Sequence, residues 1–354
     1  MPGYRPTLAT DEGGLWAQME RAEADLKRSR FLIHDPQVKA YVSDIACRLS
    51  RDFCPDLRVY VVHTPYFNAM MAPNGMMQIW TGLLLRVQNE AQLAAVIGHE
   101  MGHYLRRHSL QRWRDARGKS DAAAIFAFAG LPGAIAQFGL LASIFSFSRD
   151  QEREADAIGL DLMAKAGYKP LEAPRVWEQL IAEQDKADKA RSRDIFFASH
   201  PAPEERVGNL RAQALGRDGP LFEDGLQRVR HWQQLKGIRS LLLADELKLR
   251  QFGQSEVLFD LLIREQGEDS ELYFYKGEIH RIRNADGDTA KAYEAYGRAI
   301  DLGTAPPETF RSLGLTQMRE RDHAAAEQSF RRYLELLPEA SDRDIINSYM
   351  QRRV

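Results

Sequence analysis

The segment 99–103, which reads His-Glu-Met-Gly-His, constrains this chain more than any other part of it. It lies within a stretch, 90–110, whose apolar residues recur at helical spacing, so a helix is predicted there. Two histidines four positions apart on a helix share one face, and both rings can bind one metal ion. Glu100 can then take a proton from a water molecule whose pKa the ion lowers. The pattern predicts one Zn²⁺ per chain, bound by His99 and His103, with Glu100 as the general base.

A third ligand is needed, because a catalytic zinc commonly has three protein ligands and one open position. The segment 148–159 is predicted to begin a second helix. On this helix Glu152 and Asp156 share a face, and Gly159 continues that face without a side chain, which allows a close approach to the first helix. Glu154 lies about 200° around the helix from Glu152 and is expected to face solvent. This geometry predicts Glu152 as the third ligand and Asp156 as the acceptor that orients a ligating histidine.

Composition excludes several classes of protein. The 354 residues suffice for two or three domains, and 44% hydrophobic with 28% charged residues is typical of globular proteins. A formal charge of -2 provides no general attraction for nucleic acid, which is therefore not an expected partner. The chain has two cysteines, Cys47 and Cys54, and their spacing is compatible with free thiols or with one short disulfide.

The order of helical and strand patterns predicts a mostly helical α+β fold. Residues 15–51 have apolar positions at broadly helical spacing. Two short β-rich runs follow at 57–63 and 76–81, with a Pro-Asn-Gly turn signal at 73–75 between them. These runs predict a small antiparallel sheet. Helices are also predicted at about 148–166, 171–190 and 203–215.

The most apolar stretch, 122–147, is long enough to suggest a transmembrane helix. A Pro-Gly step at 132–133 divides it into two segments that are each too short to span a bilayer. We therefore expect a buried or membrane-touching helical hairpin, with a membrane surface as its potential contact. The first 30 residues contain no apolar core of the signal-peptide type. Either the protein is cytoplasmic, or a signal segment has been removed.

From about residue 227 onward the chain is predicted to be wholly helical and repetitive. Small and aromatic positions recur 34 residues later, with Ala292, Tyr296 and Ala299 matched by Ala326, Phe330 and Tyr333. Gly277 matches Gly314, and Phe259 marks a degenerate unit at 236–268. This pattern resembles the tetratricopeptide repeat, although an irregular helical bundle is the alternative. Three parts are predicted: an N-terminal helical segment at 1–56, a metallopeptidase domain at 57–220 and a helical repeat domain at 221–354.

Four ordered motifs together resemble the HtpX-like and CAAX-prenyl-protease-like family of zinc metallopeptidases. They are the run from Asn68 through Gly75 to Leu84, the motif at 99–103, the segment 148–159, and Ser199-His200-Pro201 followed by Arg206. The resemblance covers about 57–215 and implies a zincin-type domain that cleaves proteins or peptides, with His99, His103 and Glu152 as zinc ligands. It also implies a substrate bound as an extra strand along the edge that contains Gln78 to Trp80.

With its helical repeats the chain is similar to the soluble, periplasmic BepA-like branch of that family. This branch is associated with quality control and assembly of outer-membrane proteins. The resemblance therefore implies a periplasmic or cell-envelope location, with outer-membrane proteins or their assembly machinery as partners of the repeats.

His200 is the remaining candidate site residue, because the family places a His-Pro step beside the zinc. Pro201 restricts residue 200 to extended conformations, so its ring would project from a fixed backbone. Two roles stay open: His200 either donates to the oxyanion of the reaction, or binds the metal and keeps the enzyme latent. His63 and His108 are expected to be structural. The rival class for the whole chain is a chaperone-like scaffold with a latent or self-inhibited metal site.

Overall fold

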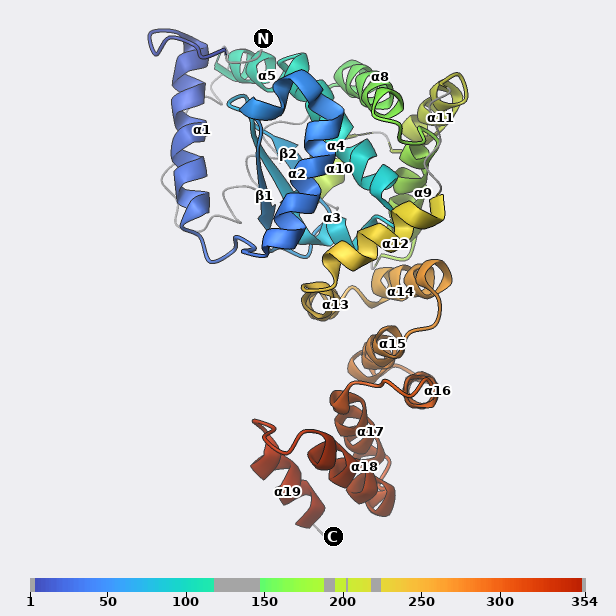
Figure 1. The fold of residues 1–354 in the computed structure, drawn as a ribbon. Helices are drawn as coiled ribbons and strands as arrows, with labels where there is room; N and C mark the ends of the chain where they lie inside the picture. The colour runs from blue at the N-terminus through green and yellow to red at the C-terminus, as the bar shows by residue number, and fades with distance from the viewer. Residues whose placement is uncertain (1–3, 118–146, 188–194, 202, 218–223, 352–354) are drawn as a thin grey trace. The chain divides into compact units, whose positions relative to one another are not determined.

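The computed structural model describes residues 4–117, 147–187, 195–201, 203–217 and 224–351 (Figure 1). The backbone contacts divide it into two units, of which the first comprises 1–185 and 189–242, and the second 186–188 and 243–354. In the described residues no helix is both long and apolar enough to cross a membrane. The predicted hairpin at 122–147 lies outside the described residues except for Phe147.

The first unit surrounds a three-stranded sheet with helices. The chain begins with α1 (Asp11–Lys27), α2 (Pro36–Ser50), the 3₁₀ helix η1 (Arg51–Asp56), β1 (Arg58–Val62), β2 (Ala69–Met71) and β3 (Met76–Trp80). It continues with α3 (Thr81–Arg86), α4 (Glu90–Leu105), α5 (His108–Arg117), α8 (Arg149–Lys165), α9 (Glu172–Asp185), α10 (Ile195–Ser199), α11 (Pro203–Ala214) and α12 (Asp224–Leu235). The helical stretch predicted at 15–51 is two helices, because Asp35 caps a new helix that begins at Pro36.

The sheet is mixed, so the prediction of an antiparallel sheet is wrong. β3 lies in the middle, parallel to β1 and antiparallel to β2. The sequence pattern missed β2, which has only three residues and is joined to β3 by a tight turn at Gly75 (φ +85°). Along the sequence β2 lies between β1 and β3 and reverses the chain direction once more, so the two longer strands run in the same direction. β3 is therefore not an edge strand, and the predicted substrate edge at Gln78 to Trp80 is wrong as well.

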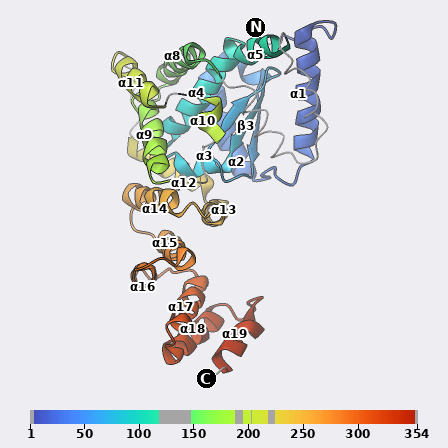
Figure 2. The ribbon, with the colours of Figure 1, turned by 180° about the vertical axis from the view of Figure 1, so that it is seen from behind.

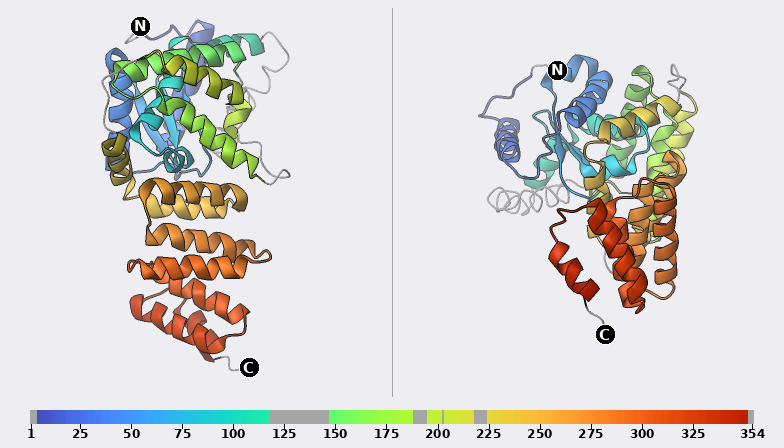
Figure 3. Two further views of the ribbon diagram at one scale, coloured as in Figure 1. Left: turned by 90° about the vertical axis from the view of Figure 1, so that its right-hand side faces the viewer. Right: turned by 60° about the horizontal axis from the view of Figure 1, so that its bottom comes forward.

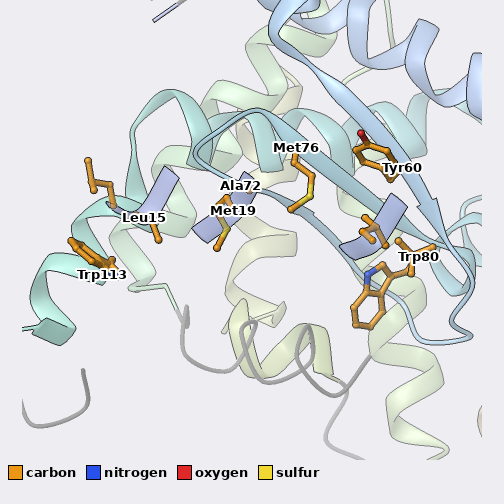
Figure 4. Close-up of a cluster of buried hydrophobic side chains, with 10 residues drawn as sticks. Leu15, Met19, Tyr60, Ala72, Met76, Trp80 and Trp113 are labelled. Carbon is orange, nitrogen blue, oxygen red and sulfur yellow. The ribbon is translucent and has the colours of Figure 1, made fainter. Parts of the chain in front are cut away.

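α1 lies over one face of the sheet, while α2 and α4 contact β1 and β2 from the other side (Figures 1 and 2). The cluster under α1 consists of Leu15, Met19, Leu26, Tyr60, Val62, Ala72, Met76, Trp80, Leu110 and Trp113 (Figure 4). Their burial from water is the main force that holds α1 in place.

A buried carboxylate reinforces the same contact. Glu23 of α1 is 3% exposed and accepts two hydrogen bonds of 2.7 Å from Arg58, and its Oε1 accepts another from Tyr60 at 2.7 Å. The side chain of Asn74 also donates to it, at 3.2 Å. Burial alone would raise the pKa of Glu23, but the hydrogen bonds from Arg58 and Tyr60 lower it from 4.5 to about 2. Glu23 therefore remains ionised in the folded protein.

We expect Glu23→Gln to lower the free energy of unfolding at pH 7 by about 2 kcal/mol, an estimate reduced for the partial exposure of Arg58. The pKa of Glu23 is lower in the folded than in the unfolded chain, so its stabilisation is complete above pH 4.5 and is lost as the pH falls toward 2. Urea unfolding of wild type and variant at several pH values measures this. Glu20→Gln, one turn earlier and exposed, is the control. A stability difference that does not shrink in acid would contradict the assignment.

Cys47 and Cys54 form a disulfide that connects the end of α2 to η1, with their Cα atoms 4.7 Å apart. The sequence spacing alone left this pairing open, because seven residues can be bridged only if the chain turns back. The 3₁₀ helix that follows α2 makes this turn.

The second unit is helical throughout its described residues. It consists of the end of α13 (Arg239–Lys248), α14 (Phe252–Gln266), α15 (Ser270–Arg283), α16 (Asp288–Asp301), α17 (Pro307–Arg319), α18 (His323–Leu336) and α19 (Arg343–Gln351) (Figure 3). α15 packs with α16, and α17 packs with α18. A Cβ at Gly277 would lie 2.3 Å from the Tyr296 ring, and one at Gly314 would lie 2.6 Å from the Phe330 ring. The small and aromatic positions that recur in the sequence thus meet within each helix pair.

Candidate active site

Two helices position the motif residues. The side chain of Asn89 caps α4, and Ser148 with Gln151 forms a capping box on α8. The helices touch backbone to backbone, because a Cβ at Gly102 would lie 2.7 Å from the Cα of Ala155. A Cβ at Gly159 would likewise lie 3.0 Å from the backbone nitrogen of residue 99. The ligand-bearing faces of α4 and α8 are therefore held close together.

Four buried side chains, those of His99, His103, Glu152 and His200, bring ligand atoms within 4.8 Å of one another. The Nε2 atoms of His99 and His103 are 3.1 Å apart. Carboxylate oxygens of Glu152 lie 3.3 Å from Nε2 of His103 and 3.5 Å from Nε2 of His99. The histidines come from α4, Glu152 comes from α8, and His200 follows α10.

The hydrogen bond of His99 fixes which of its ring nitrogens carries the proton. Nδ1 lies 2.8 Å from Oδ1 of Asp156, and Arg206 binds both oxygens of this carboxylate at 2.6 and 2.9 Å. Burial alone would raise the pKa of Asp156, but Arg206 and the hydrogen bond to His99 lower it to about 2. Asp156 is thus a pure acceptor, Nδ1 of His99 donates, and Nε2 presents a lone pair to the cluster.

His103 is oriented by a residue that the sequence did not single out. Its Nδ1 lies 2.9 Å from Nδ1 of His108, whose Nε2 lies 3.1 Å from Glu154. His108 is 1% exposed, and Glu154 is partly exposed and also pairs with Arg106 at 2.8 Å. Burial lowers the pKa of His103 well below its ordinary value, so its ring is neutral. If Nδ1 of His103 donates to Nδ1 of His108, and Nε2 of His108 donates to Glu154, then Nε2 of His103 also presents a lone pair to the cluster.

The contact of His108 with a motif histidine was missed because the helix was predicted to continue to residue 110. α4 instead ends at Leu105, and Arg107 adopts the left-handed conformation with φ +59°. This turn brings His108 back beneath the motif. The prediction that Glu154 faces solvent is only partly met, since Glu154 binds His108.

The donor set fits a metal ion. Lone pairs of two imidazoles that face each other at 3.1 Å repel unless a cation lies between them. Two histidines and one carboxylate from rigid helices are typical zinc ligands. Burial alone would raise the pKa of Glu152, but His200 and Arg206 lower it, so Glu152 also offers a charged oxygen. These residues can hold a divalent cation such as zinc.

Glu100 lies beside this cluster without belonging to it. It is 3% exposed, and its Oε1 has no hydrogen-bond partner among the described residues. Nε2 of His200 lies 3.6 Å from this oxygen. Burial raises the pKa of Glu100. A buried carboxylate with an oxygen that accepts no hydrogen bond and with a raised pKa has the properties that a proton acceptor needs.

His200 is held in place by its neighbours. Its backbone N–H donates to the carbonyl of Phe196 at 2.8 Å, and the two rings stack with centroids 4.3 Å apart. Nδ1 of His200 lies 3.0 Å from Glu152 and 3.2 Å from Nε2 of His99. Arg206, which the motif comparison included without a role, binds Glu152 at 2.9 Å and lies over the Trp177 ring. The structure thus brings all the sequence-predicted site residues together, while their individual roles stay predictions.

A narrow cleft runs from the cluster along β2. Its walls include residues 68–73, Glu100, His103, Phe147 and His200. β2 has β3 on one side only, so its other side is an edge of the sheet. The structure therefore offers β2, rather than β3, as the strand edge beside the site.

Residues 33–214, just over half of the chain, match peptidase family M48, and the chain belongs to this family. The resemblance drawn from the four motifs is thereby confirmed. Mitochondrial metalloendopeptidase OMA1 of Schizosaccharomyces pombe is 35% identical over 157 residues, which cover 43% of this chain and 45% of that protein. The beta-barrel assembly-enhancing proteases of Yersinia pestis and Escherichia coli K12 are 27% identical over 232 residues and 26% over 204.

These two bacterial matches cover 59% and 53% of this chain, and 47% and 41% of the relatives. The chain thus spans about half the length of the curated relatives that it matches.

Proposed function

We propose that this chain is a zinc-dependent endopeptidase with His99, His103 and Glu152 as zinc ligands. The observation that carries the proposal is the pair of imidazole Nε2 atoms, 3.1 Å apart, beside the Glu152 carboxylate and the buried Glu100. Membership of peptidase family M48 supports hydrolysis of peptide bonds as the reaction. The deciding experiment compares the zinc content and the casein cleavage of wild type and Glu100→Gln.

When bound, zinc supplies a Lewis acid that lowers the pKa of water and polarises a carbonyl group. Glu100 takes a proton from the attacking water on its Oε1 and passes this proton to the leaving amine. Asp156 and Arg206 hold the ring of His99 in the orientation that keeps Nε2 toward the cluster. The buried surroundings strengthen each of these electrostatic interactions.

The substrate binds as an additional strand along β2. Asn68 and Ala72 make main-chain hydrogen bonds to β3, so in an antiparallel pair the main-chain groups of Ala69 and Met71 point to the opposite side. That side faces the cleft beside Glu100. Main-chain pairing there would bind many sequences, which suits an enzyme that acts on varied polypeptides.

His200 is proposed to occupy the position that water needs, and so to keep the enzyme latent. The support is its membership of the four-residue ligand set and its fixed backbone before Pro201. The same arrangement favours, as a second candidate, a chaperone-like scaffold with a self-inhibited metal site. In that case the chain would protect client proteins even with Glu100→Gln.

His200→Ala is expected to raise basal hydrolysis severalfold with the metal retained, because it frees a coordination position. Cleavage of an internally quenched peptide, measured together with zinc content, checks this. A fall of ~10²–10³ in rate with the metal retained would instead identify an oxyanion donor. His63→Ala, a histidine outside the ligand set, is the control.

The biological setting is proposed from three lines of support. The helix pairs of the second unit, with an aromatic ring over a glycine, suit tetratricopeptide-like repeats that bind proteins. We retain the division into a helical segment at 1–56, a peptidase domain at 57–220 and a repeat domain at 221–354.

The Cys47–Cys54 disulfide favours an oxidising compartment such as the periplasm over the cytoplasm. Relatives named beta-barrel assembly-enhancing protease suggest protein quality control in the cell envelope, with outer-membrane proteins or their assembly machinery as partners.

A chain that ends at residue 242 is expected to keep its zinc and to cleave short peptides, but to lose action on its physiological protein. It retains α12, whose His231 is buried, lies 2.8 Å from the Tyr41 hydroxyl and 3.2 Å from the carbonyl of Leu84. A chain that ends at 220 lacks these contacts and should unfold at lower temperature. Thermal unfolding and peptide cleavage compare the two. Unimpaired processing of the physiological protein would exclude the repeats as its docking site.

A further inference from the structure

A second cavity, of about 470 Å³, opens beside the cleft. Met71, Pro73, His103 and Ser109 line both, so the two lie side by side next to a proposed zinc ligand. The other walls are largely apolar and include Trp16, Phe53, Tyr104, Leu105 and Leu110. A volume of this size lies within the range of pockets that bind organic ligands.

Part of the wall comes from residues that precede the match to the peptidase family. Tyr4, Glu12 and Trp16 lie before residue 33, where the match begins. α1 is anchored to the sheet by the apolar cluster that includes Leu15 and by the bonds of Glu23. The cavity is therefore built in part by residues that lie outside the matched region.

The charged groups at the cavity neutralise each other. Arg107 forms an ion pair with Glu12, and its guanidinium lies 5.7 Å from the centre of the Tyr4 ring. The Nε1 of Trp16 is bonded to Glu20 at 3.1 Å, which leaves the ring surface for apolar contact. An acidic or basic ligand group would have to break the Arg107 pair, whereas an apolar side chain would not.

We propose that this cavity binds a large apolar side chain of the substrate, aromatic or leucine-like, close to the scissile bond. This inference rests on the proposed endopeptidase function and names its substrate class. Folded proteins bury most such side chains, whereas unfolded segments expose them. A peptidase that requires one beside the scissile bond cuts unfolded segments and spares folded neighbours.

The test uses full-length, zinc-loaded protein and internally quenched peptides that differ at one position, Phe or Ala. Wild type is expected to favour the Phe peptide by about 10- to 100-fold in kcat/KM, in line with the burial of one large apolar side chain. Trp16→Ala should reduce this ratio about tenfold. Ser109→Trp, which places a large ring in the cavity from the wall that it shares with the cleft, should reduce the ratio more than Trp16→Ala does. Trp232→Ala, a partly buried tryptophan outside the cavity, should leave the ratio unchanged. A wild-type ratio near one, or a ratio that neither cavity variant changes, would overturn the proposal.

A binding measurement separates this proposal from the endopeptidase function. Fluorescence anisotropy with Glu100→Gln and labelled Phe and Ala peptides should show tighter binding of the Phe peptide, and adding Trp16→Ala should remove the preference. If wild type holds zinc but cuts neither peptide, the endopeptidase function fails. The binding preference alone then shows whether the cavity binds the apolar side chain. Equal binding of the two peptides would then overturn it.

Discussion

Glu100→Gln is expected to reduce peptide hydrolysis by at least ~10²-fold while the protein keeps stoichiometric zinc. Glutamine preserves the shape of the side chain but cannot take a proton. Glu100 lies outside the ligand set, so the metal should stay. The measurement is kcat for an internally quenched peptide, together with zinc content by atomic emission.

Glu204→Gln is the matched control for this variant, because Glu204 is exposed and is not among the ligand residues. If Glu100→Gln retained wild-type activity, the proposed mechanism would be wrong even with His99 and His103 bound to zinc. If it lost zinc as well as activity, Glu100 would act through the ligands rather than as the base.

Glu152→Gln is expected to have the second large effect, a loss of zinc affinity of more than ~100-fold. A carboxylate that binds the metal directly should matter more than residues that orient a ligand, whose removal typically costs 10- to 100-fold. Asp156→Asn and Glu154→Gln should therefore weaken binding less, through His99 and His108 respectively. Chelator competition gives each dissociation constant.

Thermal unfolding gives an independent measure of the same ranking, since a ligand present at 100 times its dissociation constant stabilises the fold by about 2.7 kcal/mol. The zinc-dependent rise in melting temperature should be smaller for Glu152→Gln than for Asp156→Asn or Glu154→Gln. A larger loss of affinity for Glu154→Gln than for Glu152→Gln would show that the helix-face assignment is wrong.

The parts of the site that depend on helix geometry could be predicted from the sequence. Residues four apart on a helix share a face whatever the rest of the fold does, and this rule brings His99 to His103 and Glu152 to Asp156. The tertiary contact between the two helices was also foreseeable, because Gly159 removes the side chain that would separate them.

The parts that depend on chain reversal were not predictable in the same way. β2 is too short to show an alternating pattern, and without it the direction of β1 relative to β3 has no local signal. His108 reaches the motif only because Arg107 adopts a left-handed conformation, which no sequence rule assigns to arginine. The cavity wall at Trp16 depends on where α1 packs, and this is decided by burial of its apolar face rather than by local pattern.

The backbone contact between α4 and α8 affects how the enzyme should respond to damage elsewhere. At Gly102 and Gly159 peptide atoms, which cannot repack as side chains do, set the separation of the two helices. Mutations in the distant core should therefore lower the number of folded molecules without changing the chemistry of those that remain. Active-site titration of such variants should give an unaltered turnover per folded molecule, so that inherited or engineered losses of activity report abundance rather than catalytic quality.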